Sequence, residues 1–141
     1  MITTLLQALL ALLLLMPIQP LWAAPVEWIE VPATQEGQQW WDSGSLRLNR
    51  RGELTVLSRF TPAAGEDGEQ RPGELYVMAI DCGTSRFRDL QVNGLPRLKQ
   101  EWEIAADDAL IGSVIHEVCS AARSLNSTNA KLQTHLYINQ K

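Results

Sequence analysis

Residues 74–82 read ELYVMAIDC, and the side chains of this stretch decide the fold. In an extended strand, successive side chains point to opposite faces of the sheet. One face then carries every second residue from Tyr76 to Cys82, and the other face carries Leu75 and Val77. Both faces are apolar, which is typical of a central strand that is covered on two sides. We therefore expect a helix on one face, and a second subunit or the N-terminal segment on the other.

Other segments have the pattern of strands that neighbour this central strand. Residues 26–31 and 53–60 alternate in the way of half-buried strands, and the second should form a hairpin with residues 46–48. The Asn93-Gly94 pair between two short apolar runs is a strong hairpin signal. Residues 61–73 contain Pro, Gly and acidic residues without periodicity, which predicts a long mobile loop. These patterns predict an α+β fold with an antiparallel sheet of about five or six strands.

The hydrophobic period changes near the C-terminus. Residues 107–123, DDALIGSVIHEVCSAAR, place apolar side chains at spacings of three and four, the stripe of an amphipathic helix. Asp107 is expected to cap the first turn, and Arg123 suits the last turn. The stripe contains Cys119, so we expect one C-terminal helix to pack across one face of the sheet with Cys119 turned toward it.

The chain has two cysteines, and their positions favour a disulfide between Cys82 and Cys119. Cys82 ends a strand on its core face, and Cys119 lies on the helical stripe that would cover that face. A catalytic thiol needs an exposed, electropositive setting, whereas the acidic Asp81 precedes Cys82. A reactive thiol or a metal ligand remains the alternative. In an oxidising compartment, the bridge is expected to stabilise the fold by about 4 kcal/mol.

The N-terminus reads as a secretory signal peptide over residues 1–23, MITTLLQALLALLLLMPIQPLWA. Its apolar stretch, residues 5–16, is shorter than the roughly 20 residues that a membrane span needs. Two prolines and an imperfect small-residue cleavage site follow it. An uncleaved membrane anchor is the alternative. Residues 24–124 are then expected to form a single disulfide-stapled domain, and residues 125–141 a polar C-terminal tail.

Composition and motifs exclude several classes of function. The net charge of −4 is carried by a mixed-sign surface, which argues against nucleic acid as a partner. No stretch after residue 24 is apolar enough to form a stable membrane span once the signal is cleaved. HEVCS at 116–120 begins like a zinc-peptidase motif, but Ser120 stands where the second histidine belongs. Without a catalytic constellation, we expect no enzyme, no metal and no cofactor.

The tryptophans are the most informative candidates for a binding surface. Trp40 and Trp41 are adjacent in one strand, so they must point to opposite faces. One of the two is therefore either under the helix or available to a partner. With Leu75 and Val77 on the strand face away from the helix, this pair makes up the expected surface for a protein partner. The other candidates of this kind are Trp28 and Trp102.

Taken together, these segments resemble the surface-adhesin protein E-like domain of bacterial exported proteins. The resemblance covers roughly residues 26–122 and rests on an early tryptophan, on WWDSGSLRLNRRGELTVLSRF, on YVMAIDC, and on a tryptophan before a helix that carries VIHEVC. It implies an antiparallel sheet with a C-terminal helix across one face, fixed by a Cys82–Cys119 disulfide. The founding member resembles a dimeric adhesin of host matrix and plasma proteins, so the resemblance also implies a protein partner and allows a homodimer.

Two functions are expected on this basis. The first is an exported, non-enzymatic protein-binding domain. The alternative is a periplasmic or lumenal assembly or scaffold factor for a membrane complex, which would use the acidic loop around Glu66, Asp67 and Glu69. The founding adhesin is a lipoprotein, whereas this chain has no cysteine near the cleavage point. The expected location is therefore the periplasm or the cell surface, or the thylakoid lumen where the host has one.

Overall fold

The computed structural model describes residues 25–138, with side chains described for residues 25–127. The expected signal peptide lies outside the described residues. No helix within 25–138 is long and apolar enough to cross a membrane. The elements in chain order are β1 (Trp28–Glu30), β2 (Gly37–Asp42), the 3-10 turn η1 (Ser43–Ser45), β3 (Arg47–Leu48), β4 (Leu54–Pro62), β5 (Glu74–Asp81), β6 (Arg86–Val92), β7 (Leu95–Pro96), β8 (Glu103–Ile104) and α2 (Ala109–Ile138).

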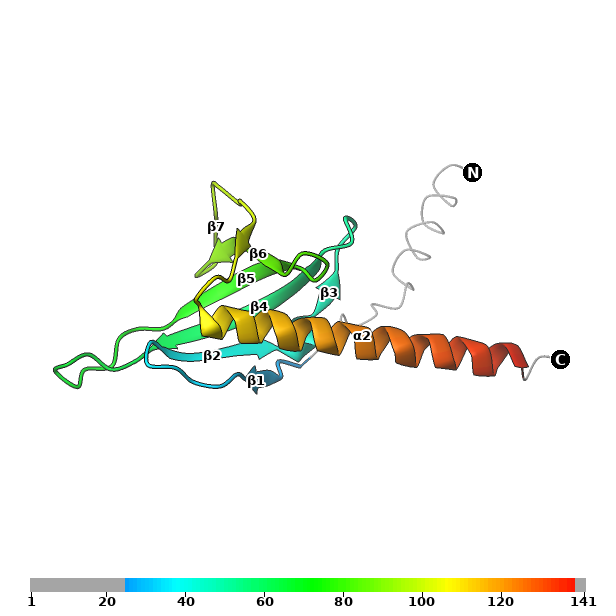
Figure 1. Ribbon diagram of the computed structural model, residues 1–141, viewed down its shortest axis with the longest axis horizontal. Coiled ribbons are helices and arrows are strands. Elements are labelled where there is room, and N and C mark those ends of the chain that lie inside the picture. Colours follow the sequence, from blue (N-terminus) through cyan, green and yellow to red (C-terminus); the bar gives the residue numbers. More distant parts are fainter. Residues whose placement is uncertain (1–24, 139–141) are drawn as a thin grey trace, which may run out of the picture.

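The strands form one antiparallel sheet in the order β1-β2-β4-β5-β6-β7, with β3 paired to β4 and β8 paired to β6 (Figure 1). The expected hairpin before β4 is confirmed, because Leu48 pairs with Leu54. The expected turn after β6 is confirmed as well: Asn93 and Gly94 have φ values of 51° and 81°, the left-handed pair that a tight hairpin turn requires. The main path of six strands agrees with the predicted sheet.

The helix α2 crosses one face of the sheet and closes the hydrophobic core between them (Figure 1). The strands contribute Trp41, Val56 and Met78, which are almost fully buried. The Trp41 indole N–H donates a hydrogen bond of 2.9 Å to Glu117 Oε2 on the helix, so this tryptophan ties the two layers together. The helix contributes a buried stripe at the predicted spacing: Leu110, Val114, Ile115, Val118 and Cys119.

Both ends of the helix differ from the sequence prediction. Asp108 rather than Asp107 caps the first turn, because the backbone N–H of Ile111 donates to Asp108 Oδ1 at 3.0 Å. The helix ends at Ile138, well beyond the predicted end near Arg123. Most of the segment predicted as a polar tail is therefore helical backbone, and it extends past the edge of the sheet (Figure 1).

The predicted disulfide is present. It joins Cys82, directly after β5, to Cys119 in α2, with a Cα–Cα distance of 5.7 Å and a sequence separation of 37 residues. Cys119 is buried on the helical stripe, whereas Cys82 is exposed at the strand end. The bridge therefore lies at the margin of the core and connects the central strand directly to the helix.

Candidate functional site

The face of the sheet that points away from α2 carries a row of side chains from three strands. Trp40 pairs with Arg59 across β2 and β4, and Arg59 pairs with Leu75 across β4 and β5. Directly paired residues place their side chains on the same face, so these three lie next to one another. We name this surface the open face and define it by Trp28, Trp40, Arg59, Leu75 and Val77.

Arg59 organises the open face through two aromatic contacts. Its guanidinium carbon lies 4.3 Å from the ring centroid of Trp40 and 5.1 Å from that of Trp28. Both distances are within the range of a cation–π interaction, which holds the planar groups in a fixed stack. The stack presents large rings and a cation in a defined geometry on the surface.

The structure separates the two adjacent tryptophans of β2. Trp41 is 2 % exposed and lies beneath α2, so it belongs to the core and is not part of a partner surface. Trp40 lies on the open face beside Leu75, which is 38 % exposed. Val77 is half-buried and pairs with Leu57 on the same face. Of the predicted partner-binding residues, Trp40, Leu75 and Val77 thus share one surface.

A second stack on the same side of the sheet was not predicted as a unit. The guanidinium of Arg88 donates to both carboxylate oxygens of Glu53 at 2.9 Å and lies 4.5 Å from the ring centroid of Trp102. The pKa of Glu53 is lowered, mainly by the hydrogen bond from Asn49 and also by that from Arg88, although burial acts in the opposite direction. The contact connects residues far apart in the sequence, and only the fold brings them together.

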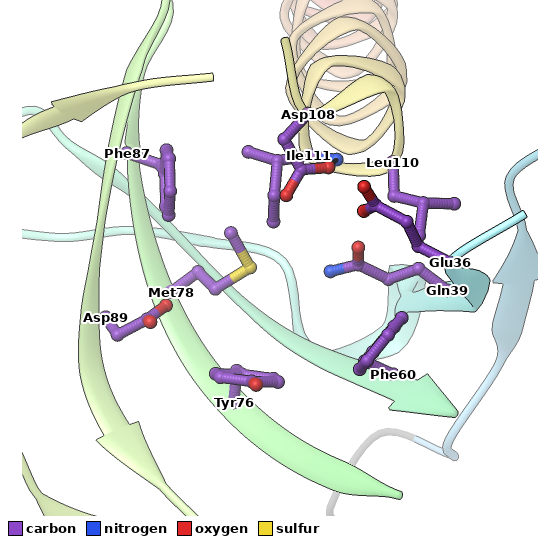
Figure 2. A pocket seen from close by; sticks show the side chains of 10 residues that line it. All are labelled: Glu36, Gln39, Phe60, Tyr76, Met78, Phe87, Asp89, Asp108, Leu110 and Ile111. Atoms are coloured by element: carbon purple, nitrogen blue, oxygen red, sulfur yellow. Dashed lines mark hydrogen bonds between the residues drawn. The ribbon is translucent and has the colours of Figure 1, made fainter. Parts of the chain in front are cut away.

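The other side of the sheet contains a pocket of about 310 Å³ beneath the first turn of α2 (Figure 2). Its walls are the rings of Phe60, Tyr76 and Phe87, with the thioether of Met78 between them. Its polar and remaining lining residues are Glu36, Gln39, Asp89, Asp108, Leu110 and Ile111. Sequence reasoning did not find this pocket.

Gln39 and Asp89 both point into this pocket (Figure 2). Gln39 is only 3 % exposed, and its Nε2 donates to Ser58 Oγ at 2.9 Å. Ser58 Oγ gives its own hydrogen to the Trp40 carbonyl at 2.8 Å, so it must accept from the amide. This fixes the amide orientation and leaves Gln39 Oε1 without a hydrogen-bond donor within the part of the chain that is described. The Asp89 carboxylate likewise receives no hydrogen bond from any described residue.

Replacing Asp89 by Asn is expected to stabilise the fold at neutral pH. Burial raises the pKa of Asp89, opposed by Arg97 and assisted by Glu103 and Glu74. An acid whose pKa is raised by folding costs stability once the pH exceeds its pKa in the unfolded chain, and the cost is full above its pKa in the folded state. Below the unfolded pKa, both states are protonated and the cost vanishes.

Urea unfolding at pH 7 and pH 3 measures this effect. The stability gain of Asp89→Asn should be present at pH 7 and small at pH 3. Asp107→Asn is the matched control, because Asp107 is exposed and its replacement by Asn makes the same change in net charge. An equal gain in both variants, or a gain at pH 3 only, would contradict the buried-carboxylate explanation.

The residues that suggested metal or thiol chemistry are not arranged for it. Cys82 and Cys119 are bonded to each other, so neither is a free thiol. His116 is exposed on α2. Among the described residues, no group of three or more His, Cys, Asp or Glu side chains is placed to hold a metal ion.

Comparison with known proteins gives one clear match. No significant match is found among curated proteins or among solved structures. The sequence model of one family, by contrast, covers the chain from within β1 to the middle of α2, including both cysteines. With residues 29–125 matched, the chain belongs to the Surface adhesin-E family.

Proposed function

We propose that this protein is an exported, non-enzymatic domain that binds a protein partner through its open face. The observation that carries the proposal is the row formed by Trp40, Arg59 and Leu75 on a sheet face that α2 leaves uncovered. Tryptophan and arginine are the residues most enriched at the centres of protein interfaces. A macromolecular partner is favoured over a small ligand because the row spans three strands of the sheet, β2, β4 and β5.

The arrangement of the open face favours tight docking. Arg59 is held between Trp28 and Trp40, so less side-chain entropy remains to be lost when a partner covers the stack. Leu75 and Val77 lie alongside and supply apolar area next to the stack. A preorganised aromatic and cationic centre with an apolar border has the anatomy of a protein-binding surface.

The expected location of the protein supports the same function. Membership in the Surface adhesin-E family and the Cys82–Cys119 disulfide both indicate a location outside the cytoplasm, where disulfides persist. A binding domain in that compartment meets either components of its own envelope or molecules from outside the cell. Both are consistent with a partner that docks on the open face.

The triple variant Trp40→Ser, Leu75→Ser, Val77→Ser tests this function. We expect it to lower the affinity for the partner about tenfold or more, because interface aromatic and apolar anchors each contribute on the order of 1–2 kcal/mol. A photo-crosslinking amino acid at position 75, used in the native host, identifies the partner by mass spectrometry. Light scattering shows whether that partner is a second copy of the chain.

The matched control is Leu125→Ser, which removes an exposed apolar side chain that is 57 % accessible on α2. It should leave partner recovery unchanged. If the triple variant is folded and recovers the partner as well as the wild type does, the open face is not the docking surface.

A second candidate function uses the loop between β4 and β5. This loop projects beyond the end of the sheet, and Glu66, Asp67 and Glu69 on it are exposed (Figure 1). Such a projection favours an assembly or scaffold factor that contacts a membrane complex. A crosslinker at position 66 in the same experiment separates the two functions, since capture from position 66 and not from position 75 supports the scaffold factor.

A further inference from the structure

We propose that the pocket beneath the first turn of α2 binds an alkylammonium group, supplied by a lysine side chain or by a free amine. This site lies on the opposite side of the sheet from the open face, so it goes beyond the function proposed above. The inference rests on three features of the pocket: its charged groups are all carboxylates, its walls are aromatic, and its carboxylates do not converge on a point.

Every charged group that lines the pocket is a carboxylate, and no Lys, Arg or His is among the lining residues. Glu36, Asp89 and Asp108 contribute carboxylates, and Gln39 contributes Oε1 (Figure 2). The side chains of Glu36 and Asp89 receive no hydrogen bond from described residues, and Asp108 uses Oδ1 alone, for the Ile111 N–H. Asp89 is half-buried, and Glu36 and Asp108 are exposed. Three carboxylates around one pocket make its potential negative, which favours a ligand rich in donors and positive charge.

The walls suit a cation that carries apolar surface. Phe60, Tyr76 and Phe87 present three rings to the pocket, and ring faces attract cations. Burial and a hydrogen bond to Glu74 raise the pKa of Tyr76, so this ring stays neutral at physiological pH. Met78 adds a polarizable, adaptable surface between the rings. An alkyl chain that ends in a cation matches both the rings and the acceptors.

The same features exclude other occupants. A divalent metal ion needs several oxygen ligands at one point, and no such group exists among the described side chains. An anion would be drawn to the helix N-terminus, but the Asp108 carboxylate already occupies that position as the cap. A purely apolar tail would leave the Asp89 carboxylate and Gln39 Oε1 unpaired. Arg97 acts on Asp89 through long-range attraction but forms no ion pair with it within the described part of the chain.

The experiment is an NMR titration of the folded, disulfide-bonded protein. The probes are Nα-acetyl-lysine amide and n-butylammonium, and the control probe is Nα-acetyl-norleucine amide, which keeps the alkyl chain and lacks the ammonium. We expect saturable shifts of signals from Tyr76, Phe87 and Ile111 with both amines, at roughly millimolar affinity for a single side chain. Tighter binding of the lysine amide than of butylammonium would assign the site to a protein lysine, and the reverse order would assign it to a free amine.

Two variants test the acceptors. Asp89→Asn keeps the volume and removes one charge, and the expected result is a loss of affinity of about tenfold, the size of a charge-assisted hydrogen bond. Glu36→Gln, at the exposed rim, should cost about threefold. Asp107→Asn changes the net charge equally beside the pocket without lining it, and it should leave the affinity within about twofold.

Three outcomes would overturn the proposal. The first is that the norleucine amide binds as tightly as the lysine amide. The second is that Asp89→Asn leaves the affinity unchanged. The third is that no probe gives saturable shifts up to roughly 50 mM, a concentration far above the expected dissociation constant. None of these outcomes affects the proposed function, which depends on the open face. The two proposals can therefore fail separately.

Discussion

Replacing Cys82 and Cys119 together by alanine is expected to lower the free energy of unfolding by about 4 kcal/mol. The disulfide closes a loop with a sequence separation of 37 residues, and breaking it returns that conformational freedom to the unfolded chain. A domain of this size has a total stability of roughly 5–15 kcal/mol, so the variant keeps only part of it. Urea unfolding followed by circular dichroism measures the loss.

Reduction provides the matched control for this prediction. Dithiothreitol should shift the wild type toward the stability of the double alanine variant and should leave the variant itself unchanged. The comparison separates the bridge from the packing of the side chains, because reduction keeps both cysteines in place. Equal stability of the oxidised wild type and the variant would show that α2 stays on the sheet without help from the bridge.

The bridge could be predicted because each cysteine lies in a strong local pattern. Alternation in the strand that ends at Asp81 placed Cys82 on the core face, and the 3.6-residue stripe placed Cys119 toward the sheet. With two cysteines, only one intramolecular pairing exists. The antiparallel sheet could be predicted from similar evidence, since the Asn93-Gly94 turn and the alternation in β4 both indicate strands that pair with the next strand along the chain.

The ends of the helix could not be predicted from the same patterns. Asp107 and Asp108 are equally good capping residues, and only the backbone geometry selects Asp108. At the other end, the backbone of α2 runs past the edge of the sheet (Figure 1). The apolar periodicity on which the prediction relied ends near Arg123, because the residues that follow, SLNSTNA at 124–130, are mostly polar.

The pocket escaped prediction for a different reason. Gln39 and Asp89 are polar residues at positions where the strand pattern points to the core, and in isolation they read as breaks in the alternation. That irregularity is the one signal that could have found the site. A β-bulge adds to the problem, because Leu90 has no partner in β5 and the face of each later residue in β6 is reversed. Simple alternation therefore misplaces the end of this strand.

The second large effect is expected at the tryptophan pair of β2. The sequence alone did not show which of the two lies beneath the helix. Trp41→Ala is expected to destabilise the protein by about 3–5 kcal/mol, because it empties a large buried site beneath α2. Trp40→Ala should cost only about 1 kcal/mol, mainly through the lost stack on Arg59. Denaturant unfolding of both variants measures the difference between two neighbouring residues of the same type.

A third substitution divides the cost at Trp41 into packing and polar parts. Trp41→Phe keeps most of the apolar volume but removes the N–H that Glu117 accepts, so its cost should fall between those of the two alanine variants. Similar costs for Trp40→Ala and Trp41→Ala would contradict the assignment of the two faces. The ordering matters for function as well, since Trp40 is available to a partner only if it lies outside the core. A folded Trp40→Ala variant beside a strongly destabilised Trp41→Ala variant would leave the open face free for that role.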